Sequence, residues 1–213
     1  MSSSDPVSTV IESNRAPLEA FRTVRLHLGM LPPFQVEELR RRSDPYLGFR
    51  DEVEEFQNEF LSGVCTRKCF SSRASDCCNR DGIAVFFADV VVECLYADDE
   101  RIDLLCRTLE QDRGGFKCAY LGPEGCLWRI KPIVCEMFLC DHAMKSVLDP
   151  DPLLRGRWED LRSRERQYTW PDRPVLFDEL EGVFLQAGHE SPLMYFHRSP
   201  GLLRVKARSM PRS

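Results

Sequence analysis

The feature that most constrains this sequence is a group of cysteines between Lys117 and Asp141. Its four thiols fall within 23 residues, separated by seven, eight and four other residues: Cys118, Cys126, Cys135 and Cys140. Two glycines and two prolines lie between these cysteines, and both residue types are typical of turns. We therefore expect a loop that presents four sulfur atoms from one short stretch of chain.

A second group of cysteines lies upstream, in a polar stretch that shows neither helical nor strand periodicity. It contains two separate thiols and one adjacent pair: Cys65, Cys69, Cys77 and Cys78. The polar composition predicts a second loop that presents ligands. The two remaining cysteines, Cys94 and Cys106, occupy apolar helical patterns, and we expect them to be free thiols packed in the core.

The N-terminal segment is polar and lacks the basic and apolar regions of a signal peptide, and no apolar run reaches the roughly 18 residues of a membrane span. We therefore expect a cytoplasmic protein without membrane association, in a reducing compartment where disulfides are rare. The net charge is −5 and the 29 basic residues are spread along the chain, which does not indicate nucleic-acid binding.

Ten cysteines in a reducing compartment need an explanation other than disulfides, and metal–thiolate bonds supply one. Four thiolates close a tetrahedral zinc site or hold an iron–sulfur cluster. We predict that the eight loop cysteines bind metal: Cys65, Cys69, Cys77, Cys78, Cys118, Cys126, Cys135 and Cys140. Buried free thiols and a disulfide framework are the two alternatives.

The spacing leaves the division of these ligands open. Two four-thiolate sites would use all eight, and a single polynuclear site would do the same. Because adjacent cysteines point apart in most backbone conformations, Cys77 and Cys78 more easily serve two sites than chelate one ion.

The cysteine pattern resembles that of the YkgJ family. The similarity covers about residues 60 to 142 and depends on the upstream cysteines together with Cys118, Leu121, Cys126, Leu127, Lys131, Pro132, Cys135, Phe138 and Cys140. The resemblance implies a zinc- or iron-chelating domain with eight recurrent cysteines, related to the cysteine-rich part of the flagellin lysine methylase FliB. The chain differs from the family in the wider upstream spacing and in having Lys131 and Glu136 where the family has arginines.

The hydrophobic periodicity predicts a mainly α fold with an irregular, cysteine-rich metal-binding core, short helices and long ligand loops. Helices are expected at 18–28, 51–61, 88–96, 100–111, 132–148, 153–168 and 175–187, with disorder at 1–15 and an extended arm at 192–205. Gly63 is expected to end the second helix. Pro132 is expected to begin a helix whose first turn favours a thiolate at Cys135.

We expect three regions: an N-terminal extension at 1–45, a metal-binding domain at 46–150, and C-terminal helices with a basic arm at 151–213. His142 is expected to be a surface residue, with a role as a spare ligand as the alternative. Asp141 is a candidate hydrogen-bond partner for a ligand, and Trp128 is expected to pack over the site.

These patterns predict a metal-binding protein in which zinc, iron or an iron–sulfur cluster such as 4Fe–4S has a structural or scaffold role, with room for a protein partner. Two alternatives stay open. One is an iron–sulfur enzyme or an accessory protein for redox or methyl-transfer chemistry, and the other is metal storage or delivery. The sequence contains no recognised catalytic or organic-cofactor motif, so the patterns assign no catalytic residue.

Overall fold

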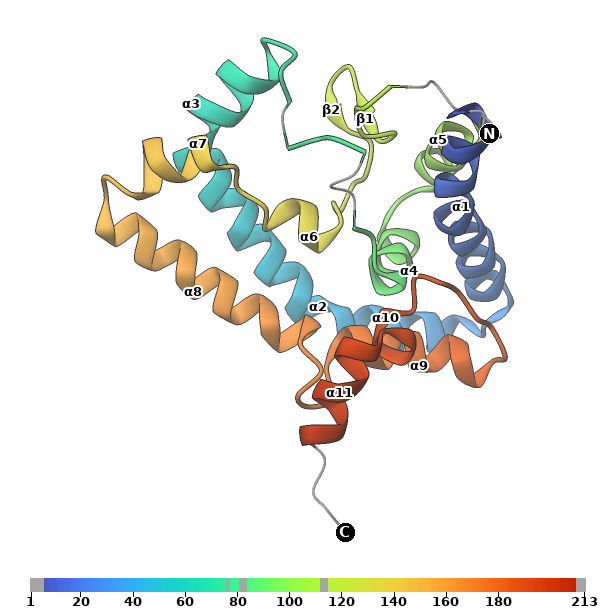
Figure 1. Cartoon of the computed structure of the whole chain (residues 1–213). Helices are drawn as coiled ribbons and strands as arrows, with labels where there is room; N and C mark the ends of the chain where they lie inside the picture. The colour runs from blue at the N-terminus through green and yellow to red at the C-terminus, as the bar shows by residue number, and fades with distance from the viewer. Residues whose placement is uncertain (1–5, 76, 81–83, 112–114, 210–213) are drawn as a thin grey trace, which may run out of the picture.

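The computed structural model describes residues 6–75, 77–80, 84–111 and 115–209, with only the backbone described for 6–12. This part of the chain is mainly α-helical, as predicted (Figure 1). Its elements are α1 (Pro6–Met30), α2 (Pro33–Phe56), η1 (Gln57–Leu61), α3 (Ser62–Val64), η2 (Cys65–Phe70), α4 (Phe87–Tyr96), α5 (Asp99–Glu110), β1 (Leu121–Gly122), β2 (Gly125–Cys126), α6 (Ile133–Glu136), α7 (Asp141–Ala143), η3 (Met144–Leu148), α8 (Pro152–Thr169), α9 (Leu176–Gln186), α10 (Tyr195–Arg198) and α11 (Pro200–Ser209), where η denotes π-helix.

Helix α4 lies at the centre of the hydrophobic core. Six of its apolar side chains are buried: Phe87, Ala88, Val90, Val91, Val92 and Leu95. Helices α1, α2 and α9 pack around it, which is why a helix that is apolar on nearly every side is stable here. Helix α5 packs on α1 and begins after Asp98, whose side chain accepts a 2.8 Å hydrogen bond from the amide of Arg101. The periodicity predicted both α4 and α5.

Helix α1 begins earlier than the sequence indicates. Residues 6–15 are helical, so the predicted disorder is wrong for this part, while residues 1–5 lie outside the described chain. Pro17 lies inside α1 instead of at its first position. Pro32 and Pro33 separate α1 from α2, and α2 begins at Pro33, because proline lacks an amide donor and is tolerated at the first helical position.

The expected regional boundaries lie within a continuous hydrophobic core. Helix α2 spans residue 45, where the division between the N-terminal extension and the metal-binding domain is expected. One hydrophobic cluster includes residues from Ala20 on α1 to Phe196 on α10.

The first cysteine segment is helical at Cys65 and Cys69, and the predicted loop is wrong there. The helical path of α2 continues through η1, α3 and η2 as far as Phe70. Glycine ends a helix when it adopts a left-handed conformation. Among the described glycines that conformation occurs at Gly115, Gly125 and Gly188, and Gly63 does not adopt it. Cys65 and Cys69 are therefore one turn apart on a helix.

The second cysteine segment is the predicted irregular loop, with a small hairpin in it. Strands β1 and β2 pair antiparallel, with Leu121 opposite Cys126. Gly125 has φ +122° in the connecting turn, a backbone conformation that glycine adopts without strain. The helix predicted at 132–148 is interrupted at 137–140 and becomes the three short elements α6, α7 and η3.

The C-terminal region consists of four helices. Helices α8 and α9 match the prediction, and Asp151 caps α8 by accepting hydrogen bonds from the amides of Leu153 and Leu154. The predicted extended arm is wrong, because α10 and α11 occupy 195–209. Pro200 begins α11 at a position that proline tolerates. None of the helices in the described chain combines the length and apolar character needed to cross a membrane.

Candidate metal centre

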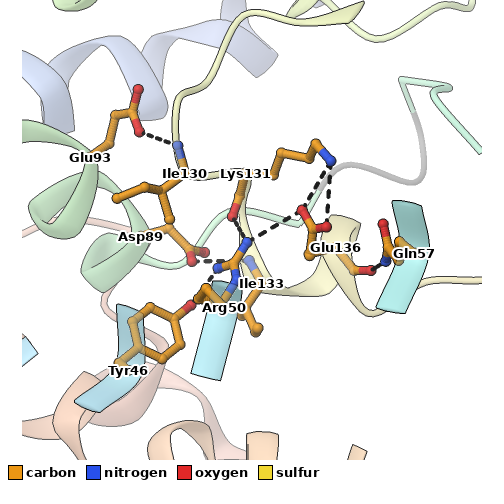
Figure 2. Close-up of polar contacts among 9 residues, drawn as sticks. All are labelled: Tyr46, Arg50, Gln57, Asp89, Glu93, Ile130, Lys131, Ile133 and Glu136. Atoms are coloured by element: carbon orange, nitrogen blue, oxygen red, sulfur yellow. Dashed lines mark hydrogen bonds and ion pairs between the residues drawn. The ribbon is translucent and has the colours of Figure 1, made fainter. Parts of the chain in front are cut away.

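Two buried carboxylates on α4 hold the chain that links Cys126 to Cys135 (Figure 2). Glu93 is fully buried and accepts 2.8 Å hydrogen bonds from the amides of Arg129 and Ile130, one on each carboxylate oxygen. Asp89 accepts a 3.1 Å hydrogen bond from the amide of Ile133, and its other oxygen accepts one from the amide of Phe86 at 2.9 Å. These bonds satisfy amides of a loop that has few backbone partners of its own.

A buried arginine on α2 fastens the same loop from the other side. One nitrogen of Arg50 (Nη1) donates to the hydroxyl of Tyr46 at 2.7 Å, and the other (Nη2) donates to the carbonyl of Lys131 at 2.7 Å (Figure 2). Arg50 also lies 3.5 Å from the carboxylate of Glu136, which Lys131 approaches at 3.2 Å. Gln57 donates to the carbonyl of Glu136 at 2.6 Å. Helix α6, which carries Cys135, is therefore bound to α2.

Burial changes the proton affinity of these carboxyls. Burial raises the pKa of Asp89 to about 7, and the hydrogen bonds from Phe86 and Ile133 act in the opposite direction. Burial likewise raises the pKa of Glu93 against the hydrogen bonds from Arg129 and Ile130. Our sequence reasoning missed both residues, although two acids four positions apart in an apolar helix are the signal of a buried polar anchor.

All ten cysteines lie in the described chain and none forms a disulfide. The eight candidate ligands are half-buried, except Cys77 and Cys135, which are exposed. Cys94 and Cys106 are half-buried and pack against the core, in keeping with the prediction for them, and burial raises the pKa of both thiols.

Backbone contacts join the two cysteine segments at Cys78 and Cys118. The amide of Cys118 donates to the carbonyl of Cys78 at 3.0 Å. Next to this pair, Asn79 and Lys117 form an isolated antiparallel bridge, and the amide of Arg80 donates to the carbonyl of Phe116 at 2.7 Å. Residues about 40 positions apart in the sequence therefore run side by side here.

Backbone amides approach three of the sulfur atoms. The Cys118 sulfur has hydrogen bonds with the backbone of Tyr120 and Leu121, and the Cys126 sulfur has one with the backbone of Trp128. A third sulfur, that of Cys135, has a hydrogen bond with the backbone of Ala84. An amide that donates to sulfur stabilises the thiolate, which is the form that binds metal.

Without a cation, burial outweighs these hydrogen bonds. It raises the pKa of Cys118 to about 11, and neighbouring thiols add to this effect. The pKa of Cys135 is raised as well, although this residue is exposed. The prediction that the first turn of α6 favours a thiolate at Cys135 is therefore not confirmed. A bound cation would reverse the balance, because a coordinating thiol loses its proton.

Electrostatic interactions among the thiols fall into two overlapping neighbourhoods, which Cys77 connects. Cys78 interacts with Cys118, Cys126 and Cys135, after the stronger effect of a hydrogen bond with Cys77 that lowers its pKa. In the second neighbourhood, burial raises the pKa of Cys65, followed by its interactions with three further thiols: Cys77, Cys140 and Cys69.

These neighbourhoods are not closed coordination sites. Within the described residues, no group of three or more His, Cys, Asp or Glu side chains is arranged so that it can hold a metal ion. The residue type nevertheless suits a soft cation, because thiolates are soft ligands.

The aromatic residue between Cys126 and Cys135 packs into the core, and its predicted position over a metal site stays a prediction. Trp128 is buried and packs on Phe21 and Tyr120, with ring centroids 5.1 Å and 5.4 Å apart. His142 is exposed, as predicted. Asp141 is also exposed and lies 3.6 Å from Lys145, which is the arrangement of an ordinary surface carboxylate.

No family model, curated protein or solved structure matches this chain. The resemblance to the YkgJ family therefore rests on the cysteine pattern alone and stays a prediction.

Proposed function

We propose that this is a metal-binding protein that holds zinc or an iron–sulfur cluster through eight cysteine thiolates, and that the metal has a structural role. The observation that carries the proposal is the backbone contact that joins the two cysteine segments at Cys78 and Cys118, together with backbone hydrogen bonds to the sulfurs of Cys118, Cys126 and Cys135. Amide–sulfur hydrogen bonds have no obvious purpose around ordinary packed thiols. Around metal thiolates they orient the ligands and offset the negative charge.

The structural role follows from how the ligand segments are held. The loop between Cys126 and Cys135 is attached to the helical core by buried polar bonds from Asp89, Glu93 and Arg50. The hairpin at β1 and β2 has only two residues in each strand, and so short a hairpin is marginal by itself. A four-thiolate zinc site contributes about 10–16 kcal/mol in small metal-dependent folds, which is ample to order such a hairpin.

An iron–sulfur cluster is the second candidate, because the same four-thiolate donor sets hold it. The two candidates differ in colour. An iron–sulfur protein purified without air is brown, with sulfur-to-iron charge-transfer absorption, whereas a zinc protein is colourless.

Chelation tests the structural role. The full chain is purified anaerobically and treated with a strong chelator, and the released metal is measured by elemental analysis. We expect the hairpin and α6 to lose amide protection from hydrogen exchange as the metal leaves. A chelated protein with unchanged protection and unchanged thermal unfolding would show that the metal has no structural role.

A further inference from the structure

Two carboxyl groups flank one imidazole ring where the C-terminal helices meet α9. Nδ1 of His197 lies 3.0 Å from Oε2 of Glu181, and Nε2 of the same ring lies 3.2 Å from Oδ1 of Asp178. Asp178 and Glu181 are three residues apart on α9 and share one face of that helix, whereas His197 belongs to α10. The group contains no residue of the two cysteine segments, so what it does is independent of the proposed function.

Lys206 connects this group to the last helix, α11. Its ammonium nitrogen donates to the same oxygen of Asp178 at 2.7 Å and to the carbonyl of Phe196 at 3.3 Å. Within the described chain, Lys206 alone gives α11 side-chain hydrogen bonds to another helix, and no residue of α11 is buried. Helix α11 lies at the edge of the molecule and leads to the C-terminus (Figure 1). The position of α11 therefore depends on its contact with Asp178.

The geometry around His197 determines how many protons the group must hold. A neutral imidazole has a single N–H, so it can offer a proton to only one of two flanking carboxylates. Its other nitrogen would then turn a lone pair towards the second carboxylate at close range, which is repulsive. Both contacts are attractive only when the group holds one proton more than a neutral imidazole and two carboxylates do.

Burial places this additional proton on Glu181. The Glu181 side chain is fully buried, whereas that of His197 is 29% exposed. Burial raises the pKa of Glu181 to about 8, with Asp178 acting in the same direction and Lys206 and two backbone amides of α10 acting against it. Burial also lowers the pKa of His197. The protonated carboxyl of Glu181 therefore donates to Nδ1, and the N–H at Nε2 faces Asp178.

The other neighbours of α9 offer no charge that would stabilise an ionised Glu181. Helices α2, α4 and α8 also pack on α9. Among the described residues, no side chain of these three helices forms a hydrogen bond or ion pair with Asp178, Glu181 or His197. The second oxygen of Glu181, Oε1, is buried and has no hydrogen-bond partner in this part of the chain. A carboxylate at this position would be poorly solvated.

We propose that Asp178, Glu181 and His197 form a proton-dependent latch that holds α10 and α11 on α9 and opens when the additional proton is lost. The proton passes to solvent through His197, which is the partly exposed member of the pair. After its loss, a buried carboxylate faces a lone pair of the imidazole. Separation of α10 from α9 hydrates the carboxylate and removes this repulsion, and α11 follows because Lys206 joins it to the same group.

The pH range of opening follows from the protons held in each state. In the open form, the last proton of the pair leaves His197 at the ordinary pKa of 6.5. In the closed form, the last proton leaves Glu181 at a pKa of about 8. The closed form holds one proton more than the open form between these values. The equilibrium constant for opening should therefore rise about tenfold per pH unit, or about 30-fold in all, and level off above pH 8.

Hydrogen exchange measured by mass spectrometry tests the latch in the anaerobically purified full chain. Exchange rates between pH 6.5 and 8 are converted to protection factors, which removes the intrinsic dependence of exchange on pH. We expect the protection of α10 and α11 to fall about 30-fold across this range, with α5 as the unchanged reference. Glu181→Gln should abolish the fall, because its NH₂ group donates to Nδ1 and cannot lose the proton. The control Glu190→Gln removes an exposed ion pair with Arg198 of α10 and should leave the fall intact.

Three results would overturn the proposal. Constant protection of α10 and α11 in the unmodified protein would show that they do not respond to the proton. An equal fall in Glu181→Gln would show that the proton belongs to another group. A parallel loss of protection in α5 would show that the whole chain unfolds and that no local latch opens.

NMR of the isotopically labelled, unmodified protein follows the proton itself and requires no variant to fold. The signals observed are those of the Glu181 carboxyl carbon and the His197 ring nitrogens. We expect the pair to lose its last proton near pH 8, with a neutral imidazole throughout that transition. Loss of the last proton at or below the ordinary histidine pKa of 6.5 would mean that the closed form holds no additional proton, and the latch would be ruled out.

Discussion

Replacing Glu93 by glutamine tests whether buried carboxylates of α4 hold the ligand loop in place. In the unmodified protein, each oxygen of this fully buried carboxylate accepts a 2.8 Å hydrogen bond from a loop amide, that of Arg129 or Ile130. Glutamine keeps the shape but replaces one oxygen with an NH₂ group, which then faces an amide donor. A hydrogen bond to a charged group contributes about 1.5–3 kcal/mol, so Glu93→Gln should reduce the free energy of unfolding by that amount.

The assay is urea unfolding followed by far-UV circular dichroism at a fixed metal concentration. Glu55→Gln is the matched control, since Glu55 is an exposed residue of α2 and its replacement should change stability by no more than about 0.5 kcal/mol. Because Glu93 holds the chain between Cys126 and Cys135, its variant should also lose metal to a chelator more readily than the Glu55→Gln control. Equal stability of the two variants would refute the anchoring role of Glu93.

Three further predictions concern the fold around the site and the C-terminal helices. Burial raises the pKa of Glu181 from 4.5 to about 8, so the stabilising contribution of its protonated carboxyl is complete below pH 4.5 and is lost as the pH rises through 8. The melting temperature of the unmodified protein should therefore fall relative to that of Glu181→Gln between pH 4.5 and 8. Parallel curves of melting temperature against pH would contradict this. Arg50→Met leaves the Glu136 carboxylate without its buried partner and should cost about 3–5 kcal/mol in chemical unfolding, whereas a cost below 1 kcal/mol would show that Arg50 is dispensable. Gly125→Ala replaces a glycine at φ +122° and should destabilise the hairpin and lower the metal content. The control Gly182→Ala lies inside α9, where an added Cβ meets nothing within 4 Å, and should raise the melting temperature slightly. A melting temperature lowered by Gly182→Ala would contradict this expectation.

The helices that the sequence predicted are those whose apolar residues repeat with helical spacing. Helices α4, α5, α8 and α9 have caps or turn residues where the pattern begins or ends, such as Asp98 and Gly188. Gly63 misled the prediction because a glycine that ends a helix commonly adopts a left-handed conformation, and Gly63 does not adopt it. Its neighbour Cys65 consequently lies on a helix instead of in a loop.

The candidate ligands were identifiable from the sequence, but their neighbours were not. Spacing along the chain groups Cys140 with Cys135, while the thiol of Cys140 also raises the pKa of Cys65, 75 residues earlier in the sequence. That neighbourhood depends on how η2 and α7 are placed by the core, which no local pattern encodes. The anchors Asp89 and Glu93 were missed for a related reason: their partners lie 36 to 44 residues away in the sequence.

Metal content is the most direct measurement of the central claim. The full chain is purified anaerobically, and zinc and iron are quantified by elemental analysis alongside the absorption spectrum and the number of thiols that react immediately with a thiol reagent. The account predicts stoichiometric zinc or iron, with the eight ligand thiols protected until a chelator removes the metal. A metal-free protein with a stable fold, in which chelator treatment leaves the reactivity of the eight thiols unchanged, would contradict it.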